Sequence, residues 1–405
     1  MNAAGLGRTI AKLRKKNGMT QLQLAARINI SDKTVSKWEN GNGFPEITVL
    51  PILSDVFGVT IDYLLKGEAH GITVGGVINT DYINIIDSGH GEKYFRKILT
   101  SVSEVGGCVP NVTVNLARID PDIFLTALGK VRNDECGRVI LTQMRKYGID
   151  TSQVKIENNY PSTGTSYIMS ERGDGESTVF YYGGANRNFT DKDIDTESLD
   201  CKILHMGSMM LLEGLDAHDD HYGTKMARLL DKVSKRGIKT SIDAGGSENE
   251  LFAQKVLTVL PYCDYVIIDE KEACRLLGVE PRNEDNSLNV KNIEESMKFI
   301  LSRGVREKVI VHCREGGFLL DRDGNFTKVG SLKVPDEHIK SKVGAGDAYA
   351  AGCLYGIYKE WEDKKILEFA ASSAVCCLSE SDSISGMRPY REIEKISNLY
   401  ERESL

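Results

Sequence analysis

The sequence predicts two folds in one chain: an all-α domain of five helices over residues 1–66, then an α/β domain over residues 72–397. In the first part, short apolar stripes recur at helical spacing and are separated by residues that favour turns. In the second part, apolar runs alternate with amphipathic helical patterns, which is typical of a doubly wound, mainly parallel sheet with helices on both faces. Extended segments near residues 82–105 and 155–182 interrupt this alternation and predict a small β lid.

The composition is that of a globular protein with room for more than one domain. Of the 405 residues, 41% are hydrophobic and 27% are charged. No apolar run approaches the length of about eighteen residues that a membrane span needs, and the basic N-terminal helix lacks the apolar core of a signal peptide. We therefore expect a cytoplasmic protein without a membrane partner. Nine cysteines without Cys-x-x-Cys spacing indicate reduced, mostly buried thiols.

Charge is distributed unevenly between the two parts. Residues 1–68 hold nine Lys or Arg against six Asp or Glu, a net +3, and the remainder holds 42 against 52, a net −10. The two parts are therefore expected to meet different partners. The cluster His218-Asp219-Asp220-His221 offers metal ligands, but so tight a cluster is more typical of a solvated helix start. We predict no metal held directly by protein side chains.

Apolar spacing and capping residues define the first two helices. An apolar stripe of the first helix consists of Leu6, Ile10 and Leu13. It ends at Asn17-Gly18, a helix stop. Thr20 then caps a second helix, in which Leu22 and Leu24-Ala25 are expected to face inward.

A third helix is predicted over Asp32–Asn40, with Ser31 as its cap and Gly41 at its end. Val35 and Trp38, three residues apart, face the core. The polar and partly basic outer face consists of Lys33, Thr34, Ser36 and Lys37. Two helices joined by a short turn, the second with such a face, are the layout that a helix-turn-helix needs to enter a major groove.

This helical segment resembles the lambda-repressor-like (Xre-type) DNA-binding domain. The stretches that carry the resemblance are Met19-Thr20-Gln21, Leu24-Ala25, Ser31 to Ser36, Lys37-Trp38-Glu39-Asn40-Gly41, Phe57-Gly58-Val59 and Asp62-Tyr63-Leu64-Leu65. The resemblance implies that a homodimer binds a double-stranded DNA operator, and that bases or phosphates contact Gln21, Ser31, Lys33, Thr34 and Lys37. A helical protein-interaction module of the same fold is the alternative.

A short polar linker, residues 67–71, leads into the second domain. Strands of the main sheet are predicted at Ile72–Ile78, Phe124–Leu128, Ile203–Met206, Thr240–Asp243, Tyr265–Ile268 and Val309–His312. Helices are predicted near residues 134–147, 223–236, 249–260, 270–277, 290–303 and 347–358. The lid strands are Tyr82–Asp87, Ser166–Glu171 and Thr178–Tyr182, the last two around the turn Gly173-Asp174-Gly175. A hairpin with Asp323-Gly324 at its tip follows Gly317 and is expected to extend one edge of the main sheet.

The stretch Ser341-Lys342-Val343-Gly344-Ala345-Gly346-Asp347 leads into a helix and indicates an anion site. Its small residues let the backbone approach a ligand closely, and the N–H groups and positive dipole end of the helix point at the loop. Asp347 would place a carboxylate beside a bound phosphate, which suits a general base in phosphoryl transfer. The alternative is an ordinary N-cap aspartate at a glycine-rich helix start.

Residues 72–397 resemble the ribokinase-like (PfkB-type) carbohydrate kinases in four motifs that occur in the family's order. The motifs are Gly75-Gly76 with Asn79-Thr80-Asp81, Gly106-Gly107 with Asn111, Asp269-Glu270-Lys271-Glu272, and Gly344-Ala345-Gly346-Asp347. The resemblance implies that a sugar is bound by Asn79, Asp81, Gly107 and Asn111. It also implies an anion hole formed by the backbone of Gly344, Ala345 and Gly346, with Asp347 as the base.

The same resemblance implies ATP and Mg²⁺ as cofactors. Magnesium and phosphates would be organised by Asp269 and Glu272, and Lys342 would add a fixed positive charge if it points inward. Sugar hydroxyls suit Asp81 because an ionised carboxylate accepts hydrogen bonds from adjacent donors. Two alternatives stay open: an Asx-type turn at Asn79 and Asp81, and a solvated helix face for Glu272.

Several positions depart from the family's pattern. Asp269 replaces an amide, and Arg314 stands where a glycine usually follows the strand. Ser341 and Lys342 stand where Asp-Thr is common, and in members with a monovalent cation that Asp is part of the cation site. Cys108-Val109-Pro110 replaces the Lys-Gly-Ala of true ribokinases, which weighs against ribose as the substrate.

The sequence therefore predicts a DNA-binding transcriptional regulator whose carbohydrate kinase domain transfers the γ-phosphate of ATP to a sugar hydroxyl. One alternative is a non-catalytic regulator that senses a sugar effector or a nucleotide. Another is a metabolic sugar kinase whose helical domain binds protein. Nucleotide turnover with a panel of sugars separates the enzyme from the sensor.

Overall fold

The computed structural model describes residues 3–59, 61–66, 71–87, 96–171, 177–245 and 249–405. Residues 67–70 of the predicted linker and the predicted turn Gly173-Asp174-Gly175 lie outside these ranges. The chain divides into two compact units, one made of Met1–His70 with Glu197–Cys201 and the other of Gly71–Thr196 with Lys202–Leu405.

Five short helices form the described part of residues 3–66, as the sequence predicts. They are α1 (Ala3–Lys16), α2 (Gln21–Arg27), α3 (Asp32–Glu39), α4 (Val49–Phe57) and α5 (Ile61–Lys66). Thr20 begins α2 with a capping box, because its hydroxyl accepts from the Gln23 N–H while the Gln23 side chain accepts from the Thr20 N–H. Ser31 caps α3 by accepting a hydrogen bond from the Thr34 N–H. Gly41, with φ +73°, follows the end of α3.

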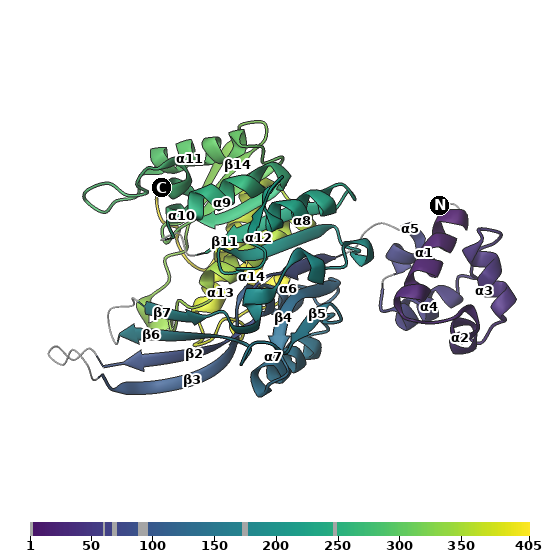
Figure 1. Ribbon diagram of the computed structural model, residues 1–405. Helices are drawn as coiled ribbons and strands as arrows, with labels where there is room; N and C mark the ends of the chain where they lie inside the picture. Colours follow the sequence, from purple (N-terminus) through teal and green to yellow (C-terminus); the bar gives the residue numbers. More distant parts are fainter. Residues whose placement is uncertain (1–2, 60, 67–70, 88–95, 172–176, 246–248) are drawn as a thin grey trace. The chain divides into compact units, whose positions relative to one another are not determined.

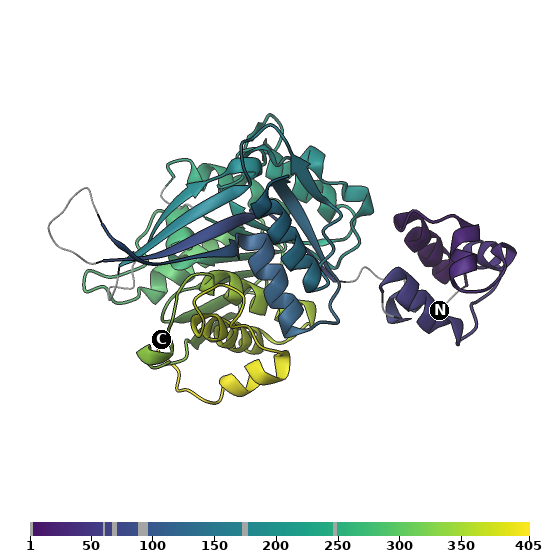
Figure 2. The same ribbon diagram turned by 90° about the horizontal axis from the view of Figure 1, so that it is seen from below.

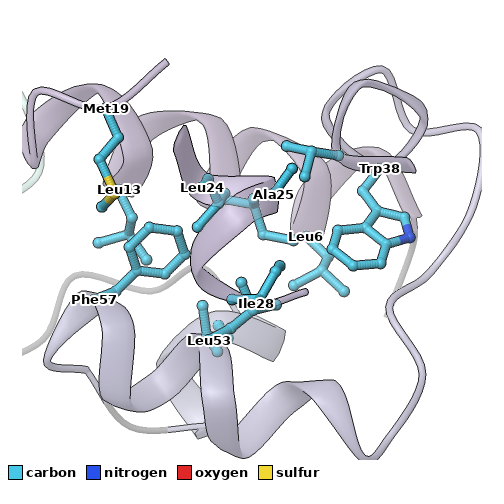
Figure 3. Packing of buried hydrophobic residues seen from close by; sticks show 12 residues of the cluster. Leu6, Leu13, Met19, Leu24, Ala25, Ile28, Trp38, Leu53 and Phe57 are labelled. Atoms are coloured by element: carbon cyan, nitrogen blue, oxygen red, sulfur yellow. The ribbon is translucent and has the colours of Figure 1, made fainter. Parts of the chain in front are cut away.

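Apolar side chains from all five helices meet in one core, most of which Figure 3 shows. The predicted inward residues are buried, with Leu22 as the exception at 67% exposed. The expectation for Leu22 was wrong: at about 100° per residue, the centre of the face formed by Leu24, Ala25 and Ile28 lies ~110° away from it. Gly7 lets α1 approach α3 closely, since a Cβ there would lie 2.0 Å from the carbonyl oxygen of Trp38.

A buried ion pair joins α1 to α3. The Arg14 guanidinium donates from Nε and Nη2 to the two carboxylate oxygens of Glu39, at 2.6 and 2.8 Å. Its Nη1 donates to the carbonyl of Met19 at 2.7 Å, and Gln21 of α2 donates to Glu39 at 2.8 Å. Only 11% of the Arg14 side chain and 7% of the Glu39 side chain are exposed. This one carboxylate therefore connects three helices.

A nine-stranded sheet forms the centre of the second unit, in the order β15-β14-β13-β12-β11-β8-β1-β4-β5. Its strands are β1 (Ile72–Gly75), β4 (Leu125–Arg132), β5 (Val154–Glu157), β8 (Ile203–Met209), β11 (Lys239–Ala244), β12 (Tyr265–Asp269), β13 (Lys308–His312), β14 (Gly316–Asp321) and β15 (Phe326–Gly330). Neighbours from β13 to β5 run parallel, which confirms the predicted sheet. The antiparallel β14 and β15, with Asp323-Gly324 between them, extend its edge as predicted.

Helices cover both faces of this sheet (Figures 1 and 2). They are α6 (Cys108–Ile119), α7 (Glu135–Lys146), α8 (Lys225–Ser234), α9 (Phe252–Val259), α10 (Glu270–Leu277), α11 (Val290–Ser302), α12 (Ala345–Tyr358), α13 (Asp363–Leu378) and α14 (Tyr390–Ile396). The sequence patterns did not reveal α6, in which the polar residues Asn111, Thr113 and Asn115 are buried together with the apolar ones, so that polarity does not mark an exposed face. Within the described residues, no helix combines the length and the apolar character needed to cross a bilayer.

The predicted helix start at His218–His221 is instead a two-stranded ribbon. Its strands are β9 (His218–Asp219) and β10 (Gly223–Thr224), which pair antiparallel. Thr224 caps α8 by accepting a hydrogen bond from the Ala227 N–H, so the helix begins after the acidic and histidine residues. The cap chemistry of Thr224 therefore sets this boundary.

A second, four-stranded sheet has the order β3-β2-β6-β7 and contains the strands predicted for the lid. The start of the predicted lid range 155–182 was wrong, because β5 pairs with β4 in the main sheet. Its strands are β2 (Asn79–Ile86), β3 (Ile98–Gly106), β6 (Gly164–Glu171) and β7 (Ser177–Tyr182). The predicted strand Ile72–Ile78 is shorter than expected, because β1 ends at Gly75 and Gly76 adopts φ +146°. Asn79 and Asp81 thus lie on the lid strand β2, and the Asx-turn alternative was wrong.

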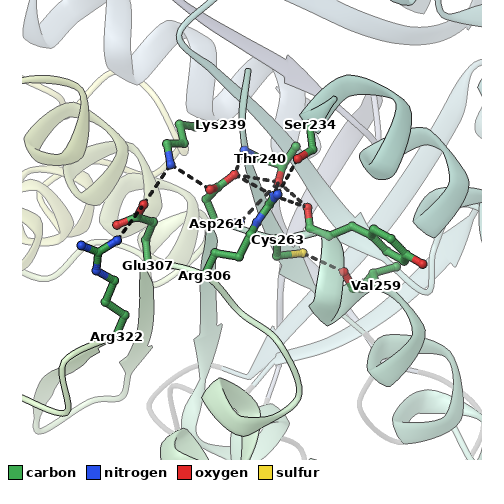
Figure 4. Close-up of polar contacts among 10 residues, drawn as sticks. Ser234, Lys239, Thr240, Val259, Cys263, Asp264, Arg306, Glu307 and Arg322 are labelled. Carbon is green, nitrogen blue, oxygen red and sulfur yellow. Dashed lines mark hydrogen bonds and ion pairs between the residues drawn. The ribbon is translucent and has the colours of Figure 1, made fainter. Parts of the chain in front are cut away.

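Figure 4 shows a network of charges at the amino ends of three neighbouring strands. Asp264, just before β12, accepts hydrogen bonds from the backbone N–H of Thr240 at 2.9 Å and from Arg306 at 2.9 Å. Lys239 donates to Asp264 at 3.0 Å and to Glu307 at 2.9 Å. The network ties β11, β12 and β13 together at the end of the sheet opposite to the candidate active site.

Candidate active site and DNA-binding face

The first two sequence motifs of the second unit meet at the start of the lid. The Asn79 side chain donates to Asp81 Oδ1 at 2.8 Å and to the Ser166 hydroxyl of β6. A Cβ on Gly106 would lie 2.1 Å from Asp81 Oδ2, and one on Gly107 would lie 2.3 Å from Asn79 Oδ1. Glycine is therefore required at both positions, because any larger side chain would collide with Asp81 or Asn79.

The second and last motifs also meet, through Asn111 and Asp347. Asn111, in the first turn of α6, donates from Nδ2 to Asp347 Oδ2 at 2.8 Å. Asp347 lies in the first turn of α12, whose N-cap is Gly344 with φ +79°. Since the Asp347 carboxylate does not cap the helix, the N-cap alternative was wrong. The half-buried carboxylate is held by an amide from a helix 236 residues earlier in the chain.

The carboxyl groups of Asp347 and Asp81 both have raised pKa values. Burial raises the pKa of Asp347 to about 7, the Asn111 hydrogen bond opposes this, and the negative charges of Asp243 and Asp81 add to it. Burial likewise raises the pKa of Asp81 to about 6, against hydrogen bonds from Ser166 and Asn79. A carboxyl group that titrates close to neutral pH is suited to accept a proton and release it again.

The backbone before Asp347 leaves N–H groups and space for an anion. The Ala345 N–H donates to the Lys342 carbonyl and the Ala348 N–H to the Gly344 carbonyl. Among the described residues, the N–H groups of Gly346 and Asp347 have no backbone acceptor. Among the described atoms outside α12 and the chain neighbours of Gly346, only Cε1 of His312 would lie within 4 Å of a Cβ on Gly346, at 3.7 Å, so the space on this side of the residue is open.

Asp269 and Glu272 form a capping box at the start of α10. The Glu272 N–H donates to Asp269 Oδ1 at 2.7 Å, and the Asp269 N–H donates to Glu272 Oε2 at 3.1 Å. Glu272 is 6% exposed, so the alternative of a solvated helix face was wrong. Burial, with the charges of Asp269 and Asp243, raises the pKa of Glu272 well above its ordinary value. Asp269, which stands in place of an amide, thus has a defined local role as the N-cap.

Two basic residues that the sequence patterns singled out, Lys342 and Arg314, are exposed. Lys342 precedes Val343 in the loop before α12, and Arg314 follows β13. The role of Lys342 beside a phosphate stays a prediction.

Asp243, at the end of β11, is a site residue that the sequence motifs did not reveal. It accepts a hydrogen bond from the Ser208 N–H and lies 3.1 Å from His205 Nε2. Its charge raises the pKa of Asp347 and of the buried Cys108 thiol, after the effect of burial on each. The available signal was an acid at the carboxyl end of a predicted parallel strand, where such sheets bind ligands.

The predicted DNA-contacting residues gather on α3 and at the start of α2. Lys33 and Lys37 are exposed and lie four residues apart, on one face of α3. The Ser31 hydroxyl caps the helix and lies 2.8 Å from Thr34 Oγ1. Gln21 is half-buried and its amide donates to Glu39. Lys33 and Lys37 are therefore the best placed of the five to meet a phosphate or a base.

The second unit thus combines a doubly wound sheet, a smaller four-stranded sheet and a glycine-rich loop at the start of α12, and the class of protein follows from a family comparison. Residues 76–389 match the family model described as pfkB family carbohydrate kinase, and the chain belongs to this family. It is a carbohydrate kinase. Residues 10–64 match a family model described as helix-turn-helix, so a helix-turn-helix domain precedes the kinase domain.

Related proteins agree with this assignment. The chain is 26% identical over 302 residues to the 5-dehydro-2-deoxygluconokinase of Clostridium botulinum, covering 74% of this chain and 85% of the relative. It is 23% identical over 306 residues to the protein of the same name in Geobacillus kaustophilus, covering 74% and 86%. The fold is similar to that of Arabidopsis thaliana ribokinase complexed with ribose and ATP, with a TM-score of 0.65 and 21% identity over 82% of this chain and 99% of that one.

An Escherichia coli protein described as a putative ribokinase II in complex with ATP and Mg²⁺ has a TM-score of 0.64 and 17% identity, covering 81% of this chain and 99% of that one. This likeness is one of fold. The predicted fold class and the predicted family are thus both confirmed.

Proposed function

We propose that this chain transfers the γ-phosphoryl group of ATP to a hydroxyl group of a small sugar, with Asp347 as the base. The observation that carries the proposal is the contact between Asn111 and Asp347, which joins the sugar-binding motif to the anion-binding loop. A hydroxyl placed between them would lie within reach of a carboxylate whose pKa is about 7. The carboxylate would take the hydroxyl proton as the oxygen attacks the phosphorus.

The polar atoms of the pocket suit a hydroxyl-rich substrate. Asn79 Oδ1 and Asn111 Oδ1 are buried, and neither has a hydrogen-bond partner in the described part of the chain. Two buried acceptors without donors are costly unless a ligand satisfies them, and sugar hydroxyls are such donors. Asp81, next to Asn79, offers a third acceptor group.

The loop at Gly344–Gly346 suits the phosphates of a nucleotide. The N–H groups of Gly346 and Asp347 are available to a phosphate, and the open space over Gly346 admits one. Asp243, Asp269, Glu272 and Asp347 make this edge of the sheet acidic, which would favour a magnesium ion bound together with the nucleotide. When bound, Mg²⁺ would neutralise charge on the phosphate oxygens. Asp269 and Glu272, at the start of α10, are the residues that would hold it.

Production of ADP with a panel of sugars and sugar acids, which includes 5-dehydro-2-deoxygluconate because the relatives bear its name, tests this proposal. We expect ADP release that needs both Mg²⁺ and one class of the panel. Nucleotide binding without any sugar-dependent turnover would contradict it, and would favour a sensor of sugar or nucleotide.

We further propose that the helix-turn-helix domain binds a double-stranded operator as a homodimer and regulates transcription. The support is the exposed basic pair Lys33 and Lys37 on α3, the helix that enters the major groove in such domains. A homodimer would place two copies of α3 on half-sites about one helical turn apart.

Replacing Lys33 or Lys37 by alanine is expected to weaken operator binding. A lysine that meets a phosphate contributes about one unit to the slope of log affinity against log salt, whereas one that reads a base costs about 1–3 kcal/mol at one position. The operator is first selected from random duplexes, and binding is then titrated at several salt concentrations. Lys291→Ala, on the exposed face of α11, is the matched control because 83% of its side chain is exposed. Unchanged affinity and salt slope in both α3 variants would remove this face from the DNA contact.

A further inference from the structure

His312 ends strand β13 at the acidic edge of the sheet, although no sequence motif includes it. In the sheet register His312 lies beside Asp269 of β12 on one side and Gly317 of β14 on the other. The parallel strands β12 and β13 end together here. His312 therefore lies at the carboxyl edge of the sheet, where α10 begins directly after β12 and where such sheets bind ligands.

The polar edge of the His312 ring faces the start of α12. Outside α12 and the chain neighbours of Gly346, Cε1 of His312 is the nearest described atom to a Cβ built on Gly346, at 3.7 Å. Because Cε1 is bonded to both ring nitrogens, the edge that carries them borders the open space over Gly346. Among the described residues, the His312 ring nitrogens have no hydrogen-bond partner. The ring nitrogens are thus available to a ligand in that space.

Packing holds the ring in this position. The Tyr349 ring lies 5.0 Å from the His312 ring, tilted by 37°. Tyr349 can reach this position because Gly317 lacks a side chain: a Cβ there would lie 1.9 Å from the Tyr349 hydroxyl. Tyr349 therefore packs over Gly317 and against the His312 ring, and the ring in turn lies beside Gly346.

The His312 imidazole can supply a side-chain hydrogen-bond donor at this edge of the sheet. A neutral imidazole has one N–H donor and one acceptor nitrogen. The imidazole can therefore donate to a phosphate alongside the backbone N–H groups of Gly346 and Asp347.

We propose that His312 donates a hydrogen bond to the terminal phosphate of a nucleotide bound at Gly344–Gly346, and so positions the phosphoryl group that is transferred. This assignment rests on the proposed function of the Gly344–Gly346 loop. It adds the side chain of His312, at the end of β13, to the backbone N–H groups of Gly346 and Asp347 as a donor to the phosphate.

A histidine resonance reports this contact directly. The 405-residue chain has seven histidines, and with ¹³C at Cε1 each gives one resonance. The resonance that disappears in His312→Gln is the one sought. Adding a non-hydrolysable ATP analogue with Mg²⁺ is expected to shift the His312 resonance more than ADP does. The exposed His221 serves as the unaffected reference. A His312 resonance that stays in place while the analogue binds would overturn the proposal.

Binding constants provide a second readout that a purely structural role would not mimic. His312→Ala should weaken binding of the ATP analogue about threefold to tenfold, the range for one neutral hydrogen bond, and leave ADP binding unchanged. His312→Asn or His312→Gln should restore part of the loss, and His221→Ala should have no effect. Equal weakening for ADP and the analogue would mean that the ring only supports the fold. Phosphoryl transfer without any dependence on His312 would refute this inference alone, whereas a shifted resonance without transfer would refute only the proposed function.

Discussion

Asp347→Asn is expected to lower phosphoryl transfer by about 10²–10⁴-fold, because asparagine keeps the shape of the side chain but cannot accept the hydroxyl proton. Nucleotide affinity should be largely kept, since Gly344 is the N-cap of α12 and the proposed anion site uses backbone N–H groups, which the substitution leaves in place. The measurement is the turnover number at saturating ATP and sugar, together with the dissociation constant of the ATP analogue.

A matched control is Asp323→Asn, at the tip of the β14–β15 hairpin, where 74% of the side chain is exposed. It should leave turnover and nucleotide affinity unchanged. Full turnover in the Asp347 variant would show that its carboxylate is not the base.

Glu39→Ala is expected to destabilise the helix-turn-helix domain by about 3–5 kcal/mol, the cost of leaving one partner of a buried ion pair without the other. The Arg14 guanidinium would remain between α1 and α3 with its two carboxylate bonds lost, and the Gln21 amide would lose its acceptor. Operator binding should be lost along with the fold. Low pH should act in the same direction as the mutation.

The sign of that pH effect follows from the Glu39 carboxyl group. Burial alone would raise its pKa, but hydrogen bonds from Arg14 and Gln21 lower it below the ordinary value. A lowered folded-state pKa stabilises the domain above the unfolded-state value, and this contribution is lost as the pH falls through the folded-state value.

Denaturant unfolding of the 405-residue chain measures the Glu39 effect when one fluorophore reports on the helical domain. The chain has two tryptophans, and in a Trp361→Phe background the buried Trp38 reports on the core that contains it. Glu295→Ala, which removes an exposed pair with Lys291, is the matched control and should cost less than about 1 kcal/mol. An unchanged Trp38 transition in Glu39→Ala would mean that the ion pair contributes no stability.

Local patterns predicted most of the fold. Alternating apolar runs located the main strands, and the side chains of Thr20 and Ser31 located two helix starts because capping is a contact within three residues. The same approach missed α6, in which polar residues are buried along with apolar ones. It also placed Leu22 inside, because the predicted helix allowed a wider apolar face than the packing uses.

The candidate site could be predicted only where a motif marks it. Asp347 and its loop stand out locally, but the Asn111 contact joins residues 236 positions apart and depends on the packing of α6 beside α12. Asp243 and His312 belong to the site because neighbouring strands end together, which requires the order of strands in the sheet. The Arg14–Glu39 pair was equally invisible, since each residue alone has the character of a surface charge.

The pH dependence of kcat/KM in the wild type and in Asn111→Ala tests most directly that Asp347 accepts the proton at this site. The carboxylate form is the active one, so wild-type kcat/KM should rise with pH and level off above about 7. The Asn111 hydrogen bond lowers the pKa of Asp347, so removing it should move the rising limb to higher pH, whatever sugar affinity is lost. A limb that stays at the same pH in Asn111→Ala would contradict the assignment of Asp347 as the base.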